Sequence, residues 1–157
     1  MQNNTIHGFN INVTWQNVSP TLKQLLLSFW LQNRAISDPE EAMRRTDDVV
    51  CVVLDAENNI AGVSSVYLAP FGAQNTPYWF YRTFLRKDAR KLGLTDRLFI
   101  ATYQLLSAQP SSAQGIIVIT ENAGLMSRGA KRRFANVGMQ YVGLTQQQQD
   151  IWKLDFT

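Results

Sequence analysis

The fold is decided by one charged stretch in the middle of the chain, LRKDARKLGLTDRLF (Leu85–Phe99). An aromatic-rich segment ends at Leu85, Gly93 permits a tight turn, and apolar residues from Leu94 onward share one helical face. A helix that begins after such a turn offers unpaired backbone N–H groups and a positive dipole end to an anion. The stretch therefore predicts a strand, an anion-binding turn and a helix, although it contains neither the GxGxxG nor the GxxxxGK[ST] string.

The residues before this stretch predict one strand, two helices and an antiparallel meander. Phe9–Trp15 alternates apolar and polar residues, which is typical of a half-buried strand. Ser19 and Asp38 each precede a proline, and a capping residue followed by proline predicts a helix N-terminus. The second helix is expected at Asp38–Arg45. Three further strands are expected at Val49–Leu54, Ile60–Leu68 and Tyr78–Leu85.

The residues after the stretch continue the alternation of strands and helices. A helix following Gly93 is succeeded by a strand, a basic helix and two closing strands, expected at Gly115–Thr120, about Leu125–Asn136, Met139–Leu144 and Ile151–Phe156. The order is β-α-α-β-β-β-α-β-α-β-β, which predicts an α/β fold (α+β mixed sheet) with a central mixed sheet flanked by helices. The length of 157 residues suits a single domain with one hydrophobic core.

The turn carries Arg90-x-x-Gly93-x-Thr95, followed by the apolar residues Leu98 and Phe99. This spacing resembles the pyrophosphate loop of the GNAT superfamily of N-acyltransferases, Arg/Gln-x-x-Gly-x-Gly/Ala, which joins the family's fourth strand to the next helix. Thr95 stands where the family usually has glycine or alanine. The order of strands and helices fits the family over nearly the whole chain. The resemblance implies a single GNAT-like acyl-CoA-binding domain over residues 1–157.

The resemblance also implies a co-substrate, acetyl-CoA or another acyl-CoA, and no metal. The pantetheine arm would pair like an extra strand with the backbone near Phe84 and Leu85, where the family's fourth and fifth strands separate. A backbone N–H near Leu85 would stabilise the oxyanion as a bound amine attacks the thioester. Arg90 and Lys91 would offset the repulsion between Asp96 and phosphate. The pyrophosphate would be held by the backbone N–H groups of Lys91, Leu92, Gly93, Leu94 and Thr95.

A second family motif has Asn, then Ala, Tyr and Gly-Phe at fixed spacings. The matching residues here are Ser127, Ala130, Phe134, Gly138 and Met139. Asn122 is an alternative to Ser127 as the first residue. The family's Tyr hydroxyl often protonates the departing thiolate, and Phe134 has no hydroxyl. Because a thiol with a pKa near about 8.5 leaves tolerably at neutral pH, this change predicts slower catalysis and not its loss.

Two further assignments concern charged residues near that motif. Arg133 borders the apolar face of the basic helix and is the better phosphate ligand. The other cations of this helix, Arg128, Lys131 and Arg132, are expected on a solvated face. Glu121 is a candidate general base, acting through water, and its alternative is an exposed loop acid.

The charge distribution leaves other functions open. The net charge is +3, with six basic residues against two acidic ones in residues 82–97 and four basic residues in 128–133. Such concentration favours one small anionic cofactor, although a basic nucleic-acid-binding module is an alternative. The aromatic run Tyr78–Tyr81 is expected in the core, with base stacking as the alternative. The first alternative to an N-acyltransferase is a CoA-binding or interaction protein of the same fold with weak or no catalysis, and the nucleic-acid-binding module is the third hypothesis.

Composition excludes several classes of protein. One cysteine and one histidine rule out an internal disulfide framework and a zinc site built on Cys and His. Cys51 lies in an apolar run and is expected to be a buried small side chain. We expect a cytoplasmic protein without a membrane partner, because the N-terminus lacks signal-peptide features and the longest apolar stretch is too short to span a bilayer. The sequence does not identify the acceptor, which is a small-molecule or protein amine. It also leaves open whether the protein forms a homodimer.

Overall fold

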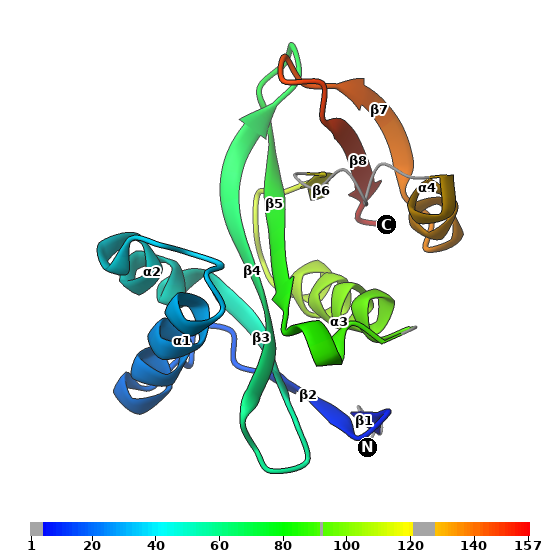
Figure 1. The fold of residues 1–157 in the computed structure, drawn as a ribbon. Helices are drawn as coiled ribbons and strands as arrows, with labels where there is room; N and C mark the ends of the chain where they lie inside the picture. The colour runs from blue at the N-terminus through cyan, green and yellow to red at the C-terminus, as the bar shows by residue number, and fades with distance from the viewer. Residues whose placement is uncertain (1–4, 92, 121–127) are drawn as a thin grey trace. The chain divides into compact units, whose positions relative to one another are not determined.

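The computed structural model describes residues 5–91, 93–120 and 128–157 (Figure 1). Helices and strands follow in the predicted order, with one additional short strand at the start. Short 3-10 helices lie at Thr46–Asp48 and Lys87–Ala89. The other elements are β1 (Thr5–Ile6), β2 (Phe9–Val13), α1 (Pro20–Gln32), α2 (Pro39–Arg45), β3 (Val49–Leu54), β4 (Ile60–Phe71), β5 (Thr76–Leu85), α3 (Leu94–Ala108), β6 (Gly115–Ile119), α4 (Arg128–Asn136), β7 (Gln140–Leu144) and β8 (Asp150–Asp155).

The described strands form one mixed sheet of eight strands in the order β1-β2-β3-β4-β5-β6-β8-β7. This arrangement confirms the predicted fold class. Residue contacts divide the chain into two compact units. Unit 1 comprises Met1–Val66 and Arg82–Thr102, and unit 2 comprises Tyr67–Tyr81 and Tyr103–Thr157.

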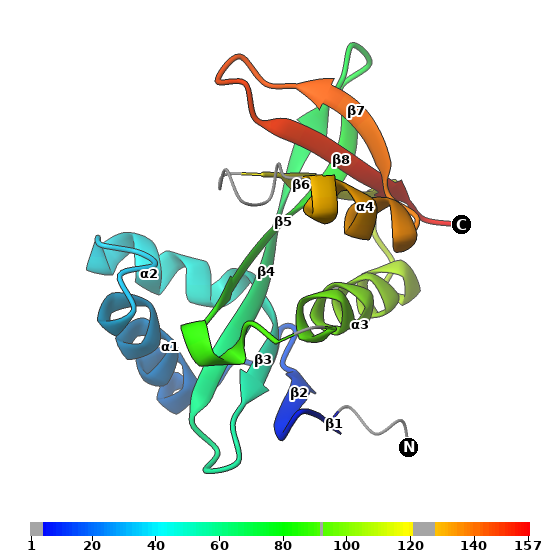
Figure 2. The same ribbon diagram turned by 45° about the vertical axis from the view of Figure 1, so that its right-hand side comes forward.

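Unit 1 is layered, with α1 and α2 on one side of β3 and β4 and the first half of α3 on the other (Figures 1 and 2). The two helix starts are capped as predicted, because Ser19 Oγ accepts from the Leu22 N–H at 3.1 Å and Asp38 Oδ1 accepts from the Glu40 N–H at 3.0 Å. The apolar face of α1 packs on the strands in a core of Leu26, Phe29, Trp30, Ile36, Ala42, Val49, Val52 and Val63.

The face of the unit 1 sheet under α3 carries a small polar network. Thr102 Oγ1 lies 2.8 Å from Ser64 Oγ and 3.8 Å from Cys51 Sγ, and it donates to the Leu98 carbonyl at 2.9 Å. Cys51 has no exposed surface, and burial raises the pKa of its thiol. The expectation of a buried cysteine is therefore confirmed.

Unit 2 contains a short parallel strand pair and an antiparallel one. β5 pairs in parallel with β6 through Trp79 with Ile116 and Phe80 with Ile117, while β8 lies antiparallel between β6 and β7. Tyr78 and Tyr81 are 6% and 8% exposed, so half of the aromatic run is core as expected.

Some predicted strand ends are wrong by a few residues. β2 ends at Val13 and not at Trp15, because the Thr14 N–H still bonds to the Val50 carbonyl but Gln16 takes a φ of 57° that turns the chain. β4 extends past Leu68 to Phe71.

Candidate functional site

The predicted anion-binding turn lies between β5 and α3 in unit 1. The 3-10 helix Lys87–Ala89 leads into it, and Gly93 takes a φ of +86°, a left-handed conformation that favours glycine. The Leu94 N–H donates to the Lys91 carbonyl at 3.1 Å, and the Arg97 N–H donates to the Gly93 carbonyl at 2.9 Å. The helix thus starts where the sequence predicts it, directly after the glycine.

The five N–H groups assigned to the pyrophosphate are not equivalent in the structure. Those of Lys91 and Leu94 already donate to loop carbonyls, with the Lys91 N–H 2.8 Å from the Ala89 oxygen. Leu92 lies outside the described residues. Gly93 and Thr95 occupy the turn and the first turn of α3, where helix N–H groups point toward the preceding loop. We therefore regard Gly93 and Thr95 as the better-placed donors.

One hydrogen bond shows in which direction the backbone groups point at the end of β5. The Arg86 N–H donates to the Ala61 carbonyl of β4 at 2.7 Å. Because successive residues of a strand direct their backbone groups to opposite sides, the Leu85 N–H and C=O point away from β4. By the same alternation the Phe84 N–H and C=O point toward β4, so of these two residues only Leu85 directs its backbone groups away from β4.

Arg90 is bound to this same edge. Its Nε donates to the Leu85 carbonyl at 3.0 Å, and its guanidinium lies 5.5 Å from the centroid of the Phe84 ring. Phe84 in turn meets Phe29 of α1 edge-on at 5.8 Å. Arg90 was assigned to the phosphates from the motif; in the structure it ties the turn to the end of β5. No sequence pattern signals this contact, since it depends on how the turn folds back.

Arg86 has a different role from the other cations of this segment. Its guanidinium contacts Asp88 at 2.5 Å and Asp55, in the turn between β3 and β4, at 3.1 Å. The Arg86 side chain lowers the pKa of the Asp88 carboxyl, and the Asn59 N–H, together with Arg86, lowers that of Asp55. The exposed cations of the turn are consequently Lys87, Arg90 and Lys91.

The second motif falls only partly within the described residues. Glu121, Asn122 and Ser127 lie outside them. Phe134 is half-buried and stacks on Trp152 of β8, with ring centroids 5.2 Å apart. Arg133 is an exposed residue of α4. Gly138 takes a φ of +91° after the helix, and Met139 is 5% exposed, as a helix-ending glycine followed by an apolar residue predicts.

One expectation for the basic helix needs correction. Arg128 and Arg132 are exposed, as predicted for a solvated face. Lys131 is not only solvated, because its Nζ lies 3.8 Å from Asp150 Oδ2 and 6.0 Å from the centroid of the Tyr141 ring. The prediction for Lys131 is wrong because residues three apart on a helix are neighbours, so Lys131 borders the face on which Phe134 stacks on Trp152.

The described part of the chain shows neither a cluster of metal-ligating side chains nor a helix fit to span a membrane. Residues 5–91, 93–120 and 128–157 contain no group of three or more His, Cys, Asp or Glu side chains that could hold a metal ion. Within the same residues, none of the helices is both long and apolar enough to cross a membrane.

No protein-family model and no curated protein matches the sequence. Solved structures do match in three dimensions. Arabidopsis thaliana NAA60 in complex with acetyl-CoA superposes with a TM-score of 0.65 at 11% identity, covering 94% of this chain and 98% of NAA60. A ribosomal-protein-S5-alanine acetyltransferase from Vibrio fischeri gives 0.64 at 12%, covering 97% and 95%. A GNAT-family acetyltransferase from Streptococcus pneumoniae gives 0.63 at 12%, covering 94% and 99%.

This chain has the GNAT fold. The similarity covers at least 94% of this chain and of each of the three compared proteins. The turn between β5 and α3, where Gly93 has a φ of +86°, is the segment whose Arg90-x-x-Gly93 spacing resembles the family's pyrophosphate loop.

Proposed function

We propose that the chain is an acyl-CoA-dependent N-acyltransferase, and specifically that it transfers an acetyl group from acetyl-CoA to an amine. The observation that carries the proposal is the turn between β5 and α3, where Gly93 at φ +86° opens the helix beside Lys87, Arg90 and Lys91. The GNAT fold supports it, and the similar NAA60 structure contains acetyl-CoA.

The residues of the turn fit CoA by three features. Gly93 and Thr95 offer backbone N–H groups at a helix N-terminus, which suit a pyrophosphate. The exposed cations of the turn add positive charge. The backbone edge at Leu85, next to Phe84, suits the amide groups of pantetheine, because a strand edge pairs with an extended chain. In this arrangement Arg90 fixes the Leu85 carbonyl, so the Leu85 N–H is the edge donor that remains for the ligand.

Bound acetyl-CoA supplies an activated thioester. Attack by the amine nitrogen forms the new C–N bond and breaks the C–S bond, the amine loses a proton, and CoA leaves as a thiolate that takes one up. We assign the Leu85 N–H to the developing charge on the thioester oxygen, because a fixed donor is most effective where charge develops in the transition state. Glu121 stays our candidate base, with Arg133, Asn122 and Ser127 as further CoA ligands.

A second candidate function is a CoA-binding protein of this fold without efficient catalysis. Phe134 favours it, because the side chain at the position of the family's tyrosine stacks on Trp152 and carries no hydroxyl. Release of CoA thiol, measured with acetyl-CoA and a panel of amines, separates the two. We expect amine-dependent thiol release; CoA binding without any amine-dependent release would establish the second candidate instead.

A further inference from the structure

Unit 2 holds a buried carboxylate that the proposed reaction does not use. Asp150 opens β8, and its side chain is 2% exposed. Its backbone N–H donates to Thr120 Oγ1 at 3.1 Å, and its carbonyl accepts from the Thr120 N–H at 3.0 Å, directly after β6. The Tyr141 hydroxyl donates to the Asp150 carboxylate, but none of the described residues donates a hydrogen bond to Oδ2 itself. Because a buried carboxylate oxygen without a hydrogen bond is costly, Oδ2 calls for a cation.

The cation nearest to it among the described residues is held loosely. Lys131 Nζ lies 3.8 Å from Oδ2, which is an ion-pair distance but too long for a hydrogen bond. The Lys131 side chain is 48% exposed. A long, half-exposed side chain loses rotamer freedom for little gain in such a pair. The Lys131 ammonium can therefore be exchanged for another cation at small cost, whereas its departure alone would leave the buried charge of Asp150 uncompensated.

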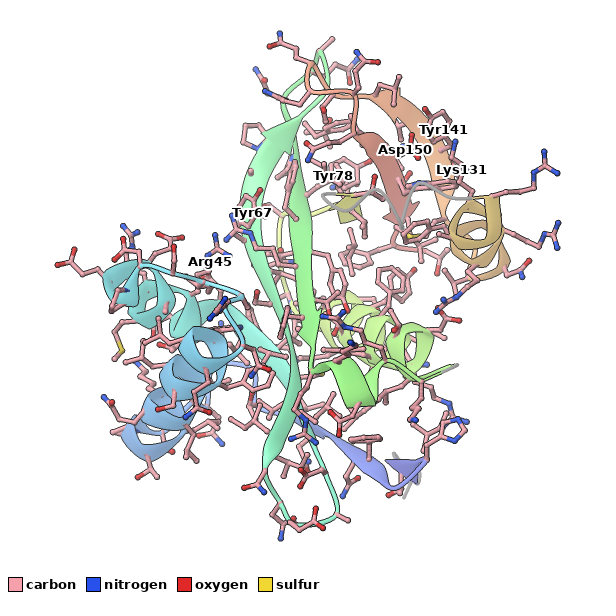
Figure 3. The ribbon with its side chains drawn as sticks, viewed as in Figure 1. Arg45, Tyr67, Tyr78, Lys131, Tyr141 and Asp150 are labelled. Atoms are coloured by element: carbon pink, nitrogen blue, oxygen red, sulfur yellow. The ribbon has the colours of Figure 1, made fainter. Side chains whose placement is uncertain are left out.

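Aromatic rings complete the surroundings of the carboxylate. Trp152 follows Asp150 by two residues and so lies on the same face of β8. Tyr141 of β7 pairs with Trp152, their ring centroids are 5.3 Å apart, and Lys131 Nζ lies 6.0 Å from the Tyr141 ring. Figure 3 shows Lys131, Tyr141 and Asp150 gathered where α4 faces β7 and β8. A carboxylate beside aromatic rings is the chemistry that recognises alkylammonium groups.

The position of this cluster also suits a ligand. Thr120 stands at the carboxyl end of β6, and β6 runs parallel to β5. Ligands of α/β sheets bind preferentially at the carboxyl ends of parallel strands.

We propose that Asp150, Tyr141 and Trp152 form a subsite for the alkylammonium group of the acceptor. The Lys131 ammonium occupies this subsite when no acceptor is bound. The acceptor role, but not the binding itself, rests on the proposed N-acyltransferase function. An ammonium on a flexible chain displaces Lys131, whose side chain turns out into solvent. An ammonium is not a nucleophile, so the subsite selects and holds the acceptor, while proton loss and attack take place elsewhere.

Direct titration of the CoA-free protein tests this subsite. The probes are Nα-acetyl-lysine amide, its neutral isostere Nα-acetyl-norleucine amide, and alanyl-alanine amide, which carries an α-ammonium. We expect the lysine amide to bind wild type, and Lys131→Gln to bind it roughly fivefold more tightly, because the internal competitor is gone. We expect no measurable binding of the norleucine amide. The alanyl-alanine amide shows whether α-ammonium groups share the subsite.

Two further variants make the result specific. Asp150→Asn should lose the binding of the lysine amide. Lys153→Gln is the matched control, because Lys153 lies on the same strand but pairs with Asp155, at 3.3 Å, and not with Asp150. The affinity of Lys153→Gln for the lysine amide should equal that of wild type. The inference would be overturned if wild type and Lys131→Gln bound the lysine amide with equal affinity. It would also be overturned if the norleucine amide bound as tightly as the lysine amide. If Asp150→Asn does not fold, Lys131→Gln still decides. This titration contains no CoA, so its outcome does not depend on the proposed function. A failure of the proposed function would appear in a separate titration, as the absence of CoA binding.

Discussion

At Gly93 the backbone takes a φ of +86°, and a Cβ built there would lie 3.4 Å from Ile6 Cδ1. A side chain at this residue is strained by the backbone and would project into the turn that we assign to the pyrophosphate. Gly72, between β4 and β5, has a similar φ of +81° with nothing within 4 Å of its Cβ. The two glycines thus differ in place but not in backbone conformation.

We predict that Gly93→Leu and Gly72→Leu each lower the free energy of unfolding by about 1 to 2 kcal/mol, the usual cost of a left-handed residue with a side chain. Only Gly93→Leu should weaken CoA binding, by about tenfold or more, because the close approach of phosphate to the backbone is blocked. Thermal melts and calorimetric titration with CoA measure both effects. Equal CoA affinities of the two variants would refute the assignment of the turn.

The glycine turn could be predicted from the sequence because it depends on local spacing, namely Arg90, Gly93 and the apolar residues that follow. The bond from Arg90 to the Leu85 carbonyl and the burial of Asp150 could not be predicted. The first depends on how the turn folds back on β5 and the second on which strands become neighbours, and residue types alone do not contain that information. Leu92, Glu121, Asn122 and Ser127 lie outside the described residues, so their roles stay predictions.

At the scale of elements, Arg86 joins the turn of the β3–β4 hairpin to the end of β5. Asp55 Oδ1 accepts from the Asn59 N–H at 2.9 Å and the Glu57 N–H at 3.0 Å, while Oδ2 contacts Arg86 at 3.1 Å. These contacts favour the ionised carboxylate, first the Asn59 N–H and then Arg86, and they lower the pKa of Asp55 in the folded protein.

A lowered pKa in the folded state makes this hairpin sensitive to acid. Its contribution to stability is present above the unfolded pKa of about 3.9 and is lost as the pH falls through the lower folded value. We predict that Asp55→Asn lowers the melting temperature at pH 7 and loses less than wild type when the pH falls from 5 to 3. Asp47→Asn, which breaks the exposed pair with Lys23, is the control and should change little. An unchanged acid response of Asp55→Asn would contradict this account of the hairpin.

The elements themselves were well predicted where capping residues and periodicity agree. Ser19 and Asp38 mark α1 and α2, and β3 has the predicted bounds, Val49–Leu54. Strand ends were less predictable, because the end of β2 is decided by the turn at Gln16 and not by the alternation of apolar residues. The β1 strand, Thr5–Ile6, was missed because two residues are too short for a periodic pattern.

At the scale of the whole molecule, the net charge of +3 is distributed over two basic segments. The structure assigns part of that charge to internal ion pairs, because Arg86 contacts Asp55 and Asp88 and Lys131 contacts Asp150. The cations that remain at the turn before α3 suit one small anion better than a long polyanion. The nucleic-acid hypothesis predicts steep salt dependence of DNA or RNA binding that CoA does not affect.

A thermal melt of the wild-type protein with and without CoA tests whether this chain has a CoA site. At a concentration about 100 times a micromolar Kd, binding to the folded state contributes roughly 2.7 kcal/mol. For a chain of 157 residues this predicts a rise in melting temperature of about 5 to 10 °C that grows with the logarithm of the CoA concentration. An unchanged melting temperature at millimolar CoA would contradict the assignment of a CoA site to this chain.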